Sequence, residues 1–209
     1  MKQERAARTR RVLVQAAAEE LDRNGYEGTS LVRICRTAEV SMGALTFHFS
    51  TKSQVADEVQ AQGRAITGAL VAQVVTSQVS PQVTALRAVM ELIVGLAALL
   101  ERNVTVRSAA RLSRERPGEA ACWGSAWLPA VRELLEQAWR DGELHPAAHP
   151  RTLEALVAYL MTGAEAHIRE RVEASVRDGA GAREPGLLDA GSQLKQIWQL
   201  FLQGAGPAR

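Results

Sequence analysis

The sequence contains little cysteine and no long hydrophobic run. Two cysteines among 209 residues cannot form a disulfide framework, and neither has a second cysteine at metal-site spacing. We expect Cys35 and Cys122 to be reduced thiols with packing roles. The strongest apolar run, Leu92 to Leu100, is only nine residues long, whereas a membrane span needs about 20. The sequence therefore predicts no membrane span.

The amino-terminus also lacks the pattern of a signal peptide. The charged segment MKQERAARTRR leads straight into residues 12–21, which contain Glu19 and Glu20 instead of an uninterrupted apolar stretch. We therefore expect a cytoplasmic protein without a membrane partner.

Catalytic and metal-binding patterns are poor. His145 and His149 lie four residues apart, but a proline follows each, so the two rings are not expected to share a helical face. Gly124-Ser125-Ala126 lacks the outer glycines of a nucleophile elbow. We predict no enzyme activity, no metal site and no cofactor. An enzyme and a helical bundle that binds only proteins remain the alternatives to a nucleic-acid-binding protein.

Positive charge is concentrated at the amino-terminus, although the net charge is only +2. Residues 1–52 hold nine Lys and Arg against six Asp and Glu, whereas the remaining residues hold 16 against 17. Five of these cations stand against Glu4 alone on a short arm: Lys2, Arg5, Arg8, Arg10 and Arg11. By charge alone, this arm could be a solvated tail or a nucleic-acid contact.

The spacing of apolar residues predicts an all-α protein of about nine helices. Apolar residues recur every three or four positions, and alternating β-branched runs are absent. Caps and breakers place the helices near residues 5–24, 31–38, 42–48, 52–76, 82–102, 104–114, 119–141, 150–178 and 187–202, with a flexible connection at 179–186.

The two carboxy-terminal helices carry apolar stripes. The stripe of the last helix comprises Leu194, Ile197, Trp198 and Phe201, and Leu153, Leu156, Val157, Leu160 and Met161 repeat the spacing on the helix before it. The stripes could be intrachain core, or they could pair with a second copy as a four-helix interface.

Residues 29–52 carry the most informative pattern. The spacing of the apolar residues lets two short helices cross steeply over one small core, which predicts a helix-turn-helix at about residues 31–50. The core residues are Leu31, Ile34, Ala38, Val40 and Leu45. The second helix would present Ser41, Met42, Gly43 and Thr46 to the major groove of DNA.

Several of these residues have chemistry that suits DNA. Gly43 lets the backbone approach a phosphate, and the hydroxyls of Ser41 and Thr46 can bond to phosphates or base edges. Lys52 begins the next helix, where its charge and the exposed amides form a phosphate clamp.

We expect the aromatic residues of this segment to divide between packing and DNA contact. Phe47 and Phe49 are predicted to pack against the first helix. His48 is predicted to face the other way and to bond to a phosphate.

These residues resemble the amino-terminal domain of TetR-type transcriptional repressors. The residues that match are Arg11-Val12-Leu13, Ala16-Ala17, Gly25-Tyr26, Thr29-Ser30-Leu31, Ile34, Ala38, Val40-Ser41, Gly43-Ala44-Leu45, Phe47-His48-Phe49 and Lys52. The segments GALTFHF, VRSAARLSRE and WLPAVRELLEQAWRDGEL are similar to the γ-butyrolactone autoregulator receptors of actinomycetes.

The resemblance implies a homodimeric repressor of secondary-metabolism or signalling genes that binds a pseudo-palindromic operator in double-stranded DNA. A helix-turn-helix domain would occupy residues 1–52, and a regulatory, dimerising domain residues 53–209. Thr29, Ser30 and Arg33 join the expected DNA contacts. A small apolar effector, butyrolactone-like or an antibiotic, would bind beside Trp127, with Trp123 on the same helical face and Thr162 nearby.

Departures from the receptor pattern affect both operator and effector. Those receptors usually have Lys and Tyr where this chain has Met42 and Thr46, and a turn glycine where it has Glu39, so an altered operator preference is expected. The small excess of basic over acidic residues, with a sequence pI of about 8.8, resembles the pseudo-receptors of the subfamily. A ligand-independent repressor is therefore the alternative.

Overall fold

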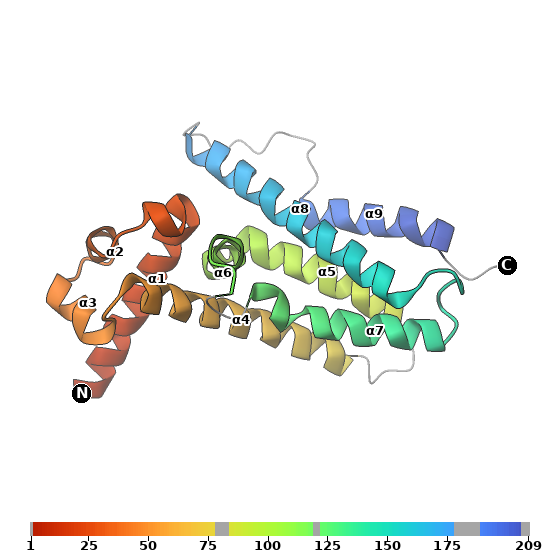
Figure 1. Cartoon of the computed structure of the whole chain (residues 1–209), viewed down its shortest axis with the longest axis horizontal. Coiled ribbons are helices and arrows are strands. Elements are labelled where there is room, and N and C mark those ends of the chain that lie inside the picture. Colours follow the sequence, from red (N-terminus) through yellow and green to blue (C-terminus); the bar gives the residue numbers. More distant parts are fainter. Residues whose placement is uncertain (1, 78–83, 119–121, 178–188, 206–209) are drawn as a thin grey trace. The chain divides into compact units, whose positions relative to one another are not determined.

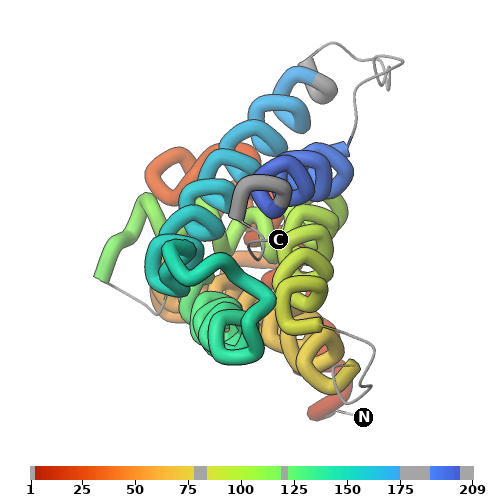
Figure 2. Tube along the Cα trace, turned by 90° about the vertical axis from the view of Figure 1, so that its right-hand side faces the viewer, coloured from red at the N-terminus to blue at the C-terminus, as the bar shows by residue number. Residues whose placement is uncertain are grey.

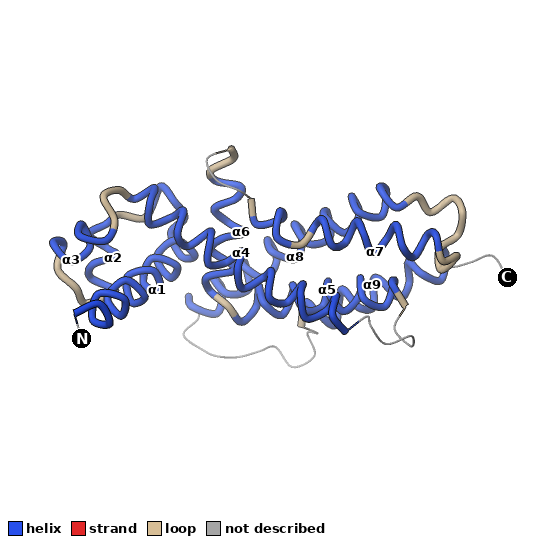
Figure 3. The backbone as a smooth tube through the Cα atoms, turned by 90° about the horizontal axis from the view of Figure 1, so that it is seen from below, coloured by secondary structure: helices blue, strands red, loops and turns tan. Residues whose placement is uncertain are grey.

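The structure is a computed structural model that describes residues 2–77, 84–118, 122–177 and 189–205. Within these ranges it contains nine α-helices, one short 3₁₀ helix and no strand (Figure 3). The all-α prediction is therefore confirmed. The helices are α1 (Lys2–Gly28), α2 (Leu31–Thr37), α3 (Met42–His48), α4 (Lys52–Ser77), α5 (Ala85–Arg102), α6 (Val104–Glu115), η1 (Trp123–Ala126), α7 (Leu128–Arg140), α8 (Pro150–Arg177) and α9 (Ala190–Ala205).

Most expected helix boundaries lie within a few residues of those observed. The expected starts at residues 82, 119 and 187 and the connection at 179–186 lie outside the described residues. None of the described helices has an apolar stretch long enough to cross a membrane.

The chain divides into two compact units. The first comprises residues 1–66 and 103–123, and the second comprises residues 67–102 and 124–209. The first unit therefore groups α6 with α1 to α3, although α6 lies far from them in sequence. The boundary expected at residue 52 separates a DNA-binding domain from a regulatory domain, whereas these units are defined by packing. The domain boundary therefore stays a prediction.

The first unit is built on a small core that α1, α2, α3, α4 and α6 share. Ile34, Ala38 and Leu45 are buried there, and Leu31 and Val40 pack against it from half-exposed positions. All five residues of the predicted helix-turn-helix core thus lie together. The other buried members come chiefly from α1 and α4 and include Leu13, Ala17, Leu21, Val55, Val59 and, from α6, Leu112.

The second unit packs α5 against α7, α8 and α9 (Figures 1 and 2). Seen from the end of these helices, α9 lies against α5, and α8 lies beside α7 (Figure 2). The stripe of α5 that faces this core repeats every three or four residues and comprises Leu86, Val89, Leu92, Ile93, Leu96 and Leu100.

The expected helix at 119–141 is wrong at its amino-terminal end. Trp123 begins the 3₁₀ turn η1, and α7 begins only at Leu128, with Trp127 as its N-cap. Pro129 explains the late start, because proline has no backbone N–H and its ring clashes with the carbonyl group four residues earlier. Trp123 and Trp127 therefore do not share the face of one helix.

Local backbone geometry sets the turns of the first unit. Gly25 interrupts α1 with a φ of +69°, so the regular helix ends at the expected Asn24-Gly25 signal. A Cβ at position 25 would also lie 2.7 Å from Arg111 Nη2 and from Glu115 Oε1. The backbone conformation favours glycine here, and a Cβ would also force the ends of the Arg111 and Glu115 side chains to shift.

Glu39 adopts a left-handed conformation, with a φ of +54°, in the turn between α2 and α3. A residue with a Cβ pays about 1–2 kcal/mol for this conformation, whereas glycine adopts it without the steric cost. After the larger chain entropy that glycine loses on folding, Glu39→Gly should raise the free energy of unfolding by about 0.5–1 kcal/mol.

Chemical denaturation measures this change, and Glu39→Ala is the control because it removes the carboxylate but keeps the Cβ. Equal stability of the glycine and alanine variants would contradict the assignment of backbone strain to this turn.

Candidate functional site

The helix-turn-helix is held by a serine cap at the start of each short helix. Ser30 Oγ accepts a hydrogen bond from Arg33 N at 3.3 Å, and Ser41 Oγ accepts one from Ala44 N at 3.2 Å. Each cap satisfies an amide that the helix itself leaves without a partner. The caps fix where α2 and α3 begin, and therefore which residues of α3 face outwards.

The exposed face of α3 contains the predicted contacts. Met42, Gly43 and Thr46 are exposed, whereas Leu45 is fully buried on the opposite side. Thr46 Oγ1 donates to Gly43 O at 3.2 Å, so the oxygen of the hydroxyl can still accept. Ser41 uses its oxygen in the cap and can still donate its hydroxyl hydrogen.

The residues around α2 fall into two groups. Ser30 and Arg33 are exposed, as a DNA contact requires. Thr29 is only 2% exposed, and its hydroxyl bonds to the carbonyl oxygens of Glu20 at 3.0 Å and Gly25 at 2.7 Å. The expectation that Thr29 contacts DNA is corrected: its side chain ties the end of α1 to the start of α2.

Lys52 is half-buried at the first position of α4. Its Nζ donates to Tyr26 O at 2.9 Å and lies 4.2 Å from the centre of the Tyr26 ring. The ammonium group has three donors, and the contact with the Tyr26 carbonyl uses one of them. A phosphate contact from Lys52 stays a prediction.

The basic amino-terminal segment is the first part of α1. Arg5, Arg8 and Arg11 are exposed, but Arg10 donates two hydrogen bonds to Glu58, at 2.8 and 2.6 Å. These hydrogen bonds hold the pKa of Glu58 below its ordinary value. The positive charge offered to a partner is therefore smaller than the sequence count suggests, because Glu58 neutralises Arg10.

Phe47 corrects the expectation for the two phenylalanines. Phe49 is 4% exposed and packs in the core as predicted, but Phe47 is 79% exposed on α3. The difference arises because α3 ends at His48 and Phe49 follows in an extended conformation. Phe47 therefore faces the surface and Phe49 faces the core, and half-buried His48 lies between them in the sequence.

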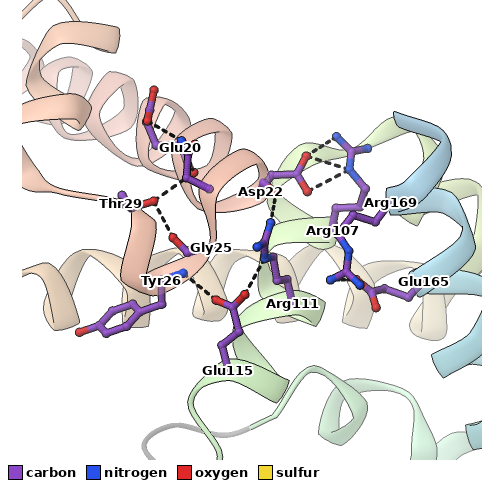
Figure 4. A network of polar contacts seen from close by, with 11 residues as sticks. Glu20, Asp22, Gly25, Tyr26, Thr29, Arg107, Arg111, Glu115, Glu165 and Arg169 are labelled. Carbon is purple, nitrogen blue, oxygen red and sulfur yellow. Dashed lines mark hydrogen bonds and ion pairs between the residues drawn. The ribbon is translucent and has the colours of Figure 1, made fainter. Parts of the chain in front are cut away.

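A polar network joins α6 to the end of α1 (Figure 4). Arg107 donates three hydrogen bonds to the Asp22 carboxylate, at 2.7 to 3.1 Å. Arg111 Nη1 donates to Asp22 O at 2.6 Å, and its Nε pairs with Glu115 at 2.6 Å. Glu115 in turn accepts from the amide of Tyr26 at 2.6 Å. The α6 residues thus satisfy backbone groups that the kink of α1 leaves open.

Arg116 extends the network to α4. Its side chain is 2% exposed and donates to Asp57 at 2.8 Å and to Ser53 at 2.7 Å. Its guanidinium also lies 4.6 Å from the centre of the Tyr26 ring, which Lys52 contacts as well. Arg116 therefore connects the end of α6 to both α1 and α4.

The sequence patterns did not predict this network, although one of them is a signal for part of it. Arg107, Arg111 and Glu115 follow one another at intervals of four, which places them on one face of a helix. Their partners Asp22 and Tyr26 are more than 80 residues away in sequence, so spacing alone could not identify them.

The candidate effector residues differ in burial and are divided between the two units. Trp127 is 3% exposed in the second unit, and Trp123 is 6% exposed in the first, where its amide donates to Ser113 Oγ at 2.7 Å. Thr162 is exposed on α8, and its hydroxyl donates to Ala158 O at 2.9 Å. Of the three residues, Trp127 has the burial that an apolar pocket in the regulatory unit requires.

The expected dimer stripe on α9 divides into two faces. Leu194 and Trp198 are 5% and 1% exposed and belong to the core of the protomer, with Phe201 half-buried beside Trp198. Ile197, in contrast, is 45% exposed. Of the two alternatives for this stripe, Leu194 and Trp198 therefore belong to the intrachain core, because the helix turns them inwards. A dimer interface on α9 stays a prediction.

An apolar groove of about 330 Å³ lies on the second unit between α8 and α9. Tyr159 and Ile197 line opposite sides of it, and both are largely exposed. The remaining lining residues are Leu156, Leu160, Gly163, Ala164, His167, Ala190, Gln193 and Leu194.

The histidine pair has a structural role. The Nδ1 atoms of His145 and His149 accept hydrogen bonds from the amides of Ala147 and Arg151. Among the described residues, no group of three or more His, Cys, Asp or Glu is arranged to hold a metal ion.

Comparison with known proteins identifies the family that the helix-turn-helix segment matches. Residues 13–59 match the family described as "Bacterial regulatory proteins, tetR family". The A-factor receptor protein of Streptomyces griseus is 30% identical over 164 residues, which are 78% of this chain and 55% of the receptor. The chain thus spans about half the length of this curated relative.

Two solved structures extend the similarity to almost the whole chain. A γ-butyrolactone receptor has a TM-score of 0.72 and 23% identity, over 98% of this chain and 90% of the receptor. The TetR family protein CprB from S. coelicolor A3(2) has a TM-score of 0.69 and 25% identity, over 96% of this chain and 91% of CprB. Matching residues 13–59 include the whole helix-turn-helix. The chain therefore carries the amino-terminal domain of the tetR family of bacterial regulatory proteins.

Proposed function

We propose that this protein is a homodimeric transcriptional repressor that binds a pseudo-palindromic operator and is released by a small apolar effector. The observation that carries the proposal is the capped helix-turn-helix, whose α3 exposes one face over a buried core. An α-helix of this size fits the major groove, and exposed cations of α1 and α2 can contact the phosphates beside it.

The groove between α8 and α9 supports a dimer. Ile197 and Leu200 of α9 are 45% and 68% exposed, and Tyr159 of α8 is 75% exposed. These side chains would lose their contact with water if the same two helices of a second copy packed against them in a four-helix arrangement. A dimer with two-fold symmetry requires two half-sites in the operator.

The effector proposal rests on Trp127 and on the relatives. Trp127 is a large aromatic side chain buried in the second unit, and such a wall suits an apolar ligand. One similar protein is described as an A-factor receptor and another as a γ-butyrolactone receptor. We therefore propose a lactone-like effector. The sequence pI of about 8.8 favours the second candidate, a repressor that responds to no effector.

Selection from random-sequence duplexes tests the repressor and its symmetry together. The full chain should enrich a palindrome with two half-sites, and Ile197→Glu should enrich a single half-site or bind much more weakly, because a buried charge opposes pairing of α9. Val75→Glu is the matched control, since Val75 is also 45% exposed but lies on α4. Failure of the native chain to enrich any duplex would refute the proposed function. A native-like palindrome for Ile197→Glu would place the dimer interface elsewhere.

The salt dependence of binding tests the proposed phosphate contact of Lys52. Lys52→Ala should weaken binding to all duplexes alike and flatten the slope of log affinity against log salt by about 0.9. Lys195→Ala is the control because Lys195 is exposed on α9. If both variants keep the native slope and the native melting temperature, Lys52 does not contact a phosphate.

The effector is tested by replacing Trp127 with phenylalanine, which keeps the pocket aromatic and avoids the cavity that alanine would leave. Trp127→Phe should bind the selected duplex normally but need at least about tenfold more alkyl γ-butyrolactone for release, which corresponds to about 1.4 kcal/mol. Trp139→Phe, at a position 46% exposed, should respond like the native chain. A native response from Trp127→Phe would refute this pocket. If neither butyrolactones nor antibiotics release the native chain, the ligand-independent repressor is the better account.

A further inference from the structure

Phe47 is the most exposed large hydrophobic side chain in the described part of the chain, at 79%. Burying a phenylalanine is favourable relative to leaving it exposed to water, because a large apolar area is removed from water. Its exposed position on α3 therefore leaves a large apolar area available to whatever contacts that helix.

Phe47 shares its face with the predicted DNA contacts. Positions 42 and 46, and positions 43 and 47, are each separated by four residues, so the members of each pair are neighbours on α3. The two pairs together form the exposed side of the helix, with Met42 and Phe47 at its opposite edges. Met42 is 40% exposed on this surface, and Gly43 and Thr46 are exposed as well. We call Met42, Gly43, Thr46 and Phe47 the reading face.

The reading face has little capacity to recognise bases by hydrogen bonding. Met42, Gly43 and Phe47 have no side-chain N–H or O–H donor, and the Thr46 hydroxyl donates to Gly43 O of its own helix. Guanine is read in the major groove by donors to its O6 and N7 atoms, which these side chains do not supply. Thymine instead presents a C5-methyl group that an apolar side chain can contact.

We propose that Phe47 selects thymine at operator positions by contacting C5-methyl groups in the major groove. The inference rests on the proposed function and deepens it, because it names what α3 reads. His48 supports the geometry: its ring meets the Phe47 ring edge-on, with centroids 5.1 Å apart and planes at 83°. This contact limits the orientations that the Phe47 ring can adopt.

The surroundings of the reading face favour DNA over a protein partner. Arg33 and Arg36 are exposed on α2 of the same helix-turn-helix. These cations can contact the phosphates, which position the protein on DNA. The apolar reading face can contact thymine methyl groups in the groove, and such base contacts specify the sequence.

The test replaces thymine by uracil, which lacks only the C5-methyl group, one position at a time in the selected duplex. For the native chain, each contacted methyl should contribute about fourfold in affinity, the equivalent of about 0.8 kcal/mol. Phe47→Ala should weaken specific binding about tenfold or more and should become insensitive to uracil at the positions that Phe47 contacts. Its salt slope should stay native, because no charge is removed.

Val32→Ala is the matched control, since Val32 is 57% exposed on α2 and lies outside the reading face. It should keep both the native affinity and the native response to uracil. Thermal unfolding of all three proteins confirms that the comparison is made on folded chains.

The outcomes separate this inference from the proposed function. Selection of a palindrome together with an equal uracil response of the native chain and Phe47→Ala would overturn the inference alone. Equal loss of binding by Phe47→Ala to selected and unrelated duplexes would also overturn it, because Phe47 would then add affinity without reading thymine. Native DNA binding by Phe47→Ala would point to a protein partner. If the native chain selects no duplex, both proposals fall.

Discussion

The arrangement of the first unit depends on the ion pair between Arg107 of α6 and Asp22 of α1. Both side chains are largely buried, at 10% and 12% exposed, and three hydrogen bonds join them. Removing one partner of such a pair leaves an uncompensated buried charge, which typically costs about 3–5 kcal/mol. The pair therefore holds α6 against α1 through three hydrogen bonds, although a buried ion pair is weak evidence of extra stability.

The position of α6 against α1 also determines the contacts that Gly25 and Tyr26 make at the end of α1. A side chain at Gly25 would displace the Arg111 and Glu115 side chains, which lie 2.7 Å from the position of its Cβ. The amide of Tyr26 donates a hydrogen bond to Glu115, and the Tyr26 ring contacts the cations of Arg116 and Lys52. The end of α1 thus contacts α6 on one side and continues into α2 on the other. A displacement of α6 would break these contacts, so the positions of α6 and of the helix-turn-helix are tied together within one compact unit.

The sequence was sufficient where local chemistry decides the structure. Caps and breakers predicted helices near residues 31–38 and 42–48, where α2 and α3 lie, and the apolar spacing predicted their shared core. Prediction failed where a nearby residue or a distant partner overrides a pattern. Pro129 shortened the helix expected to carry both Trp123 and Trp127.

Burial was the property that spacing predicted least well. Leu194 and Trp198 match the periodicity of an interface but face the core of their own protomer. Phe47 matches the family pattern, yet its exposure depends on where α3 ends. The partners of Arg107 and Arg111 lie in α1, and no periodicity within α6 could reveal them.

Amide hydrogen exchange of the full chain, with and without the selected duplex, tests this account most directly. We predict that DNA slows exchange in the segment from Ser30 to Phe49, and that α6 is protected in both states together with the core of α1. Slower exchange confined to α8 and α9, or rapid exchange of α6 while α1 stays protected, would contradict the account. The first result would remove α3 from the DNA interface, and the second would separate α6 from the unit that contains it.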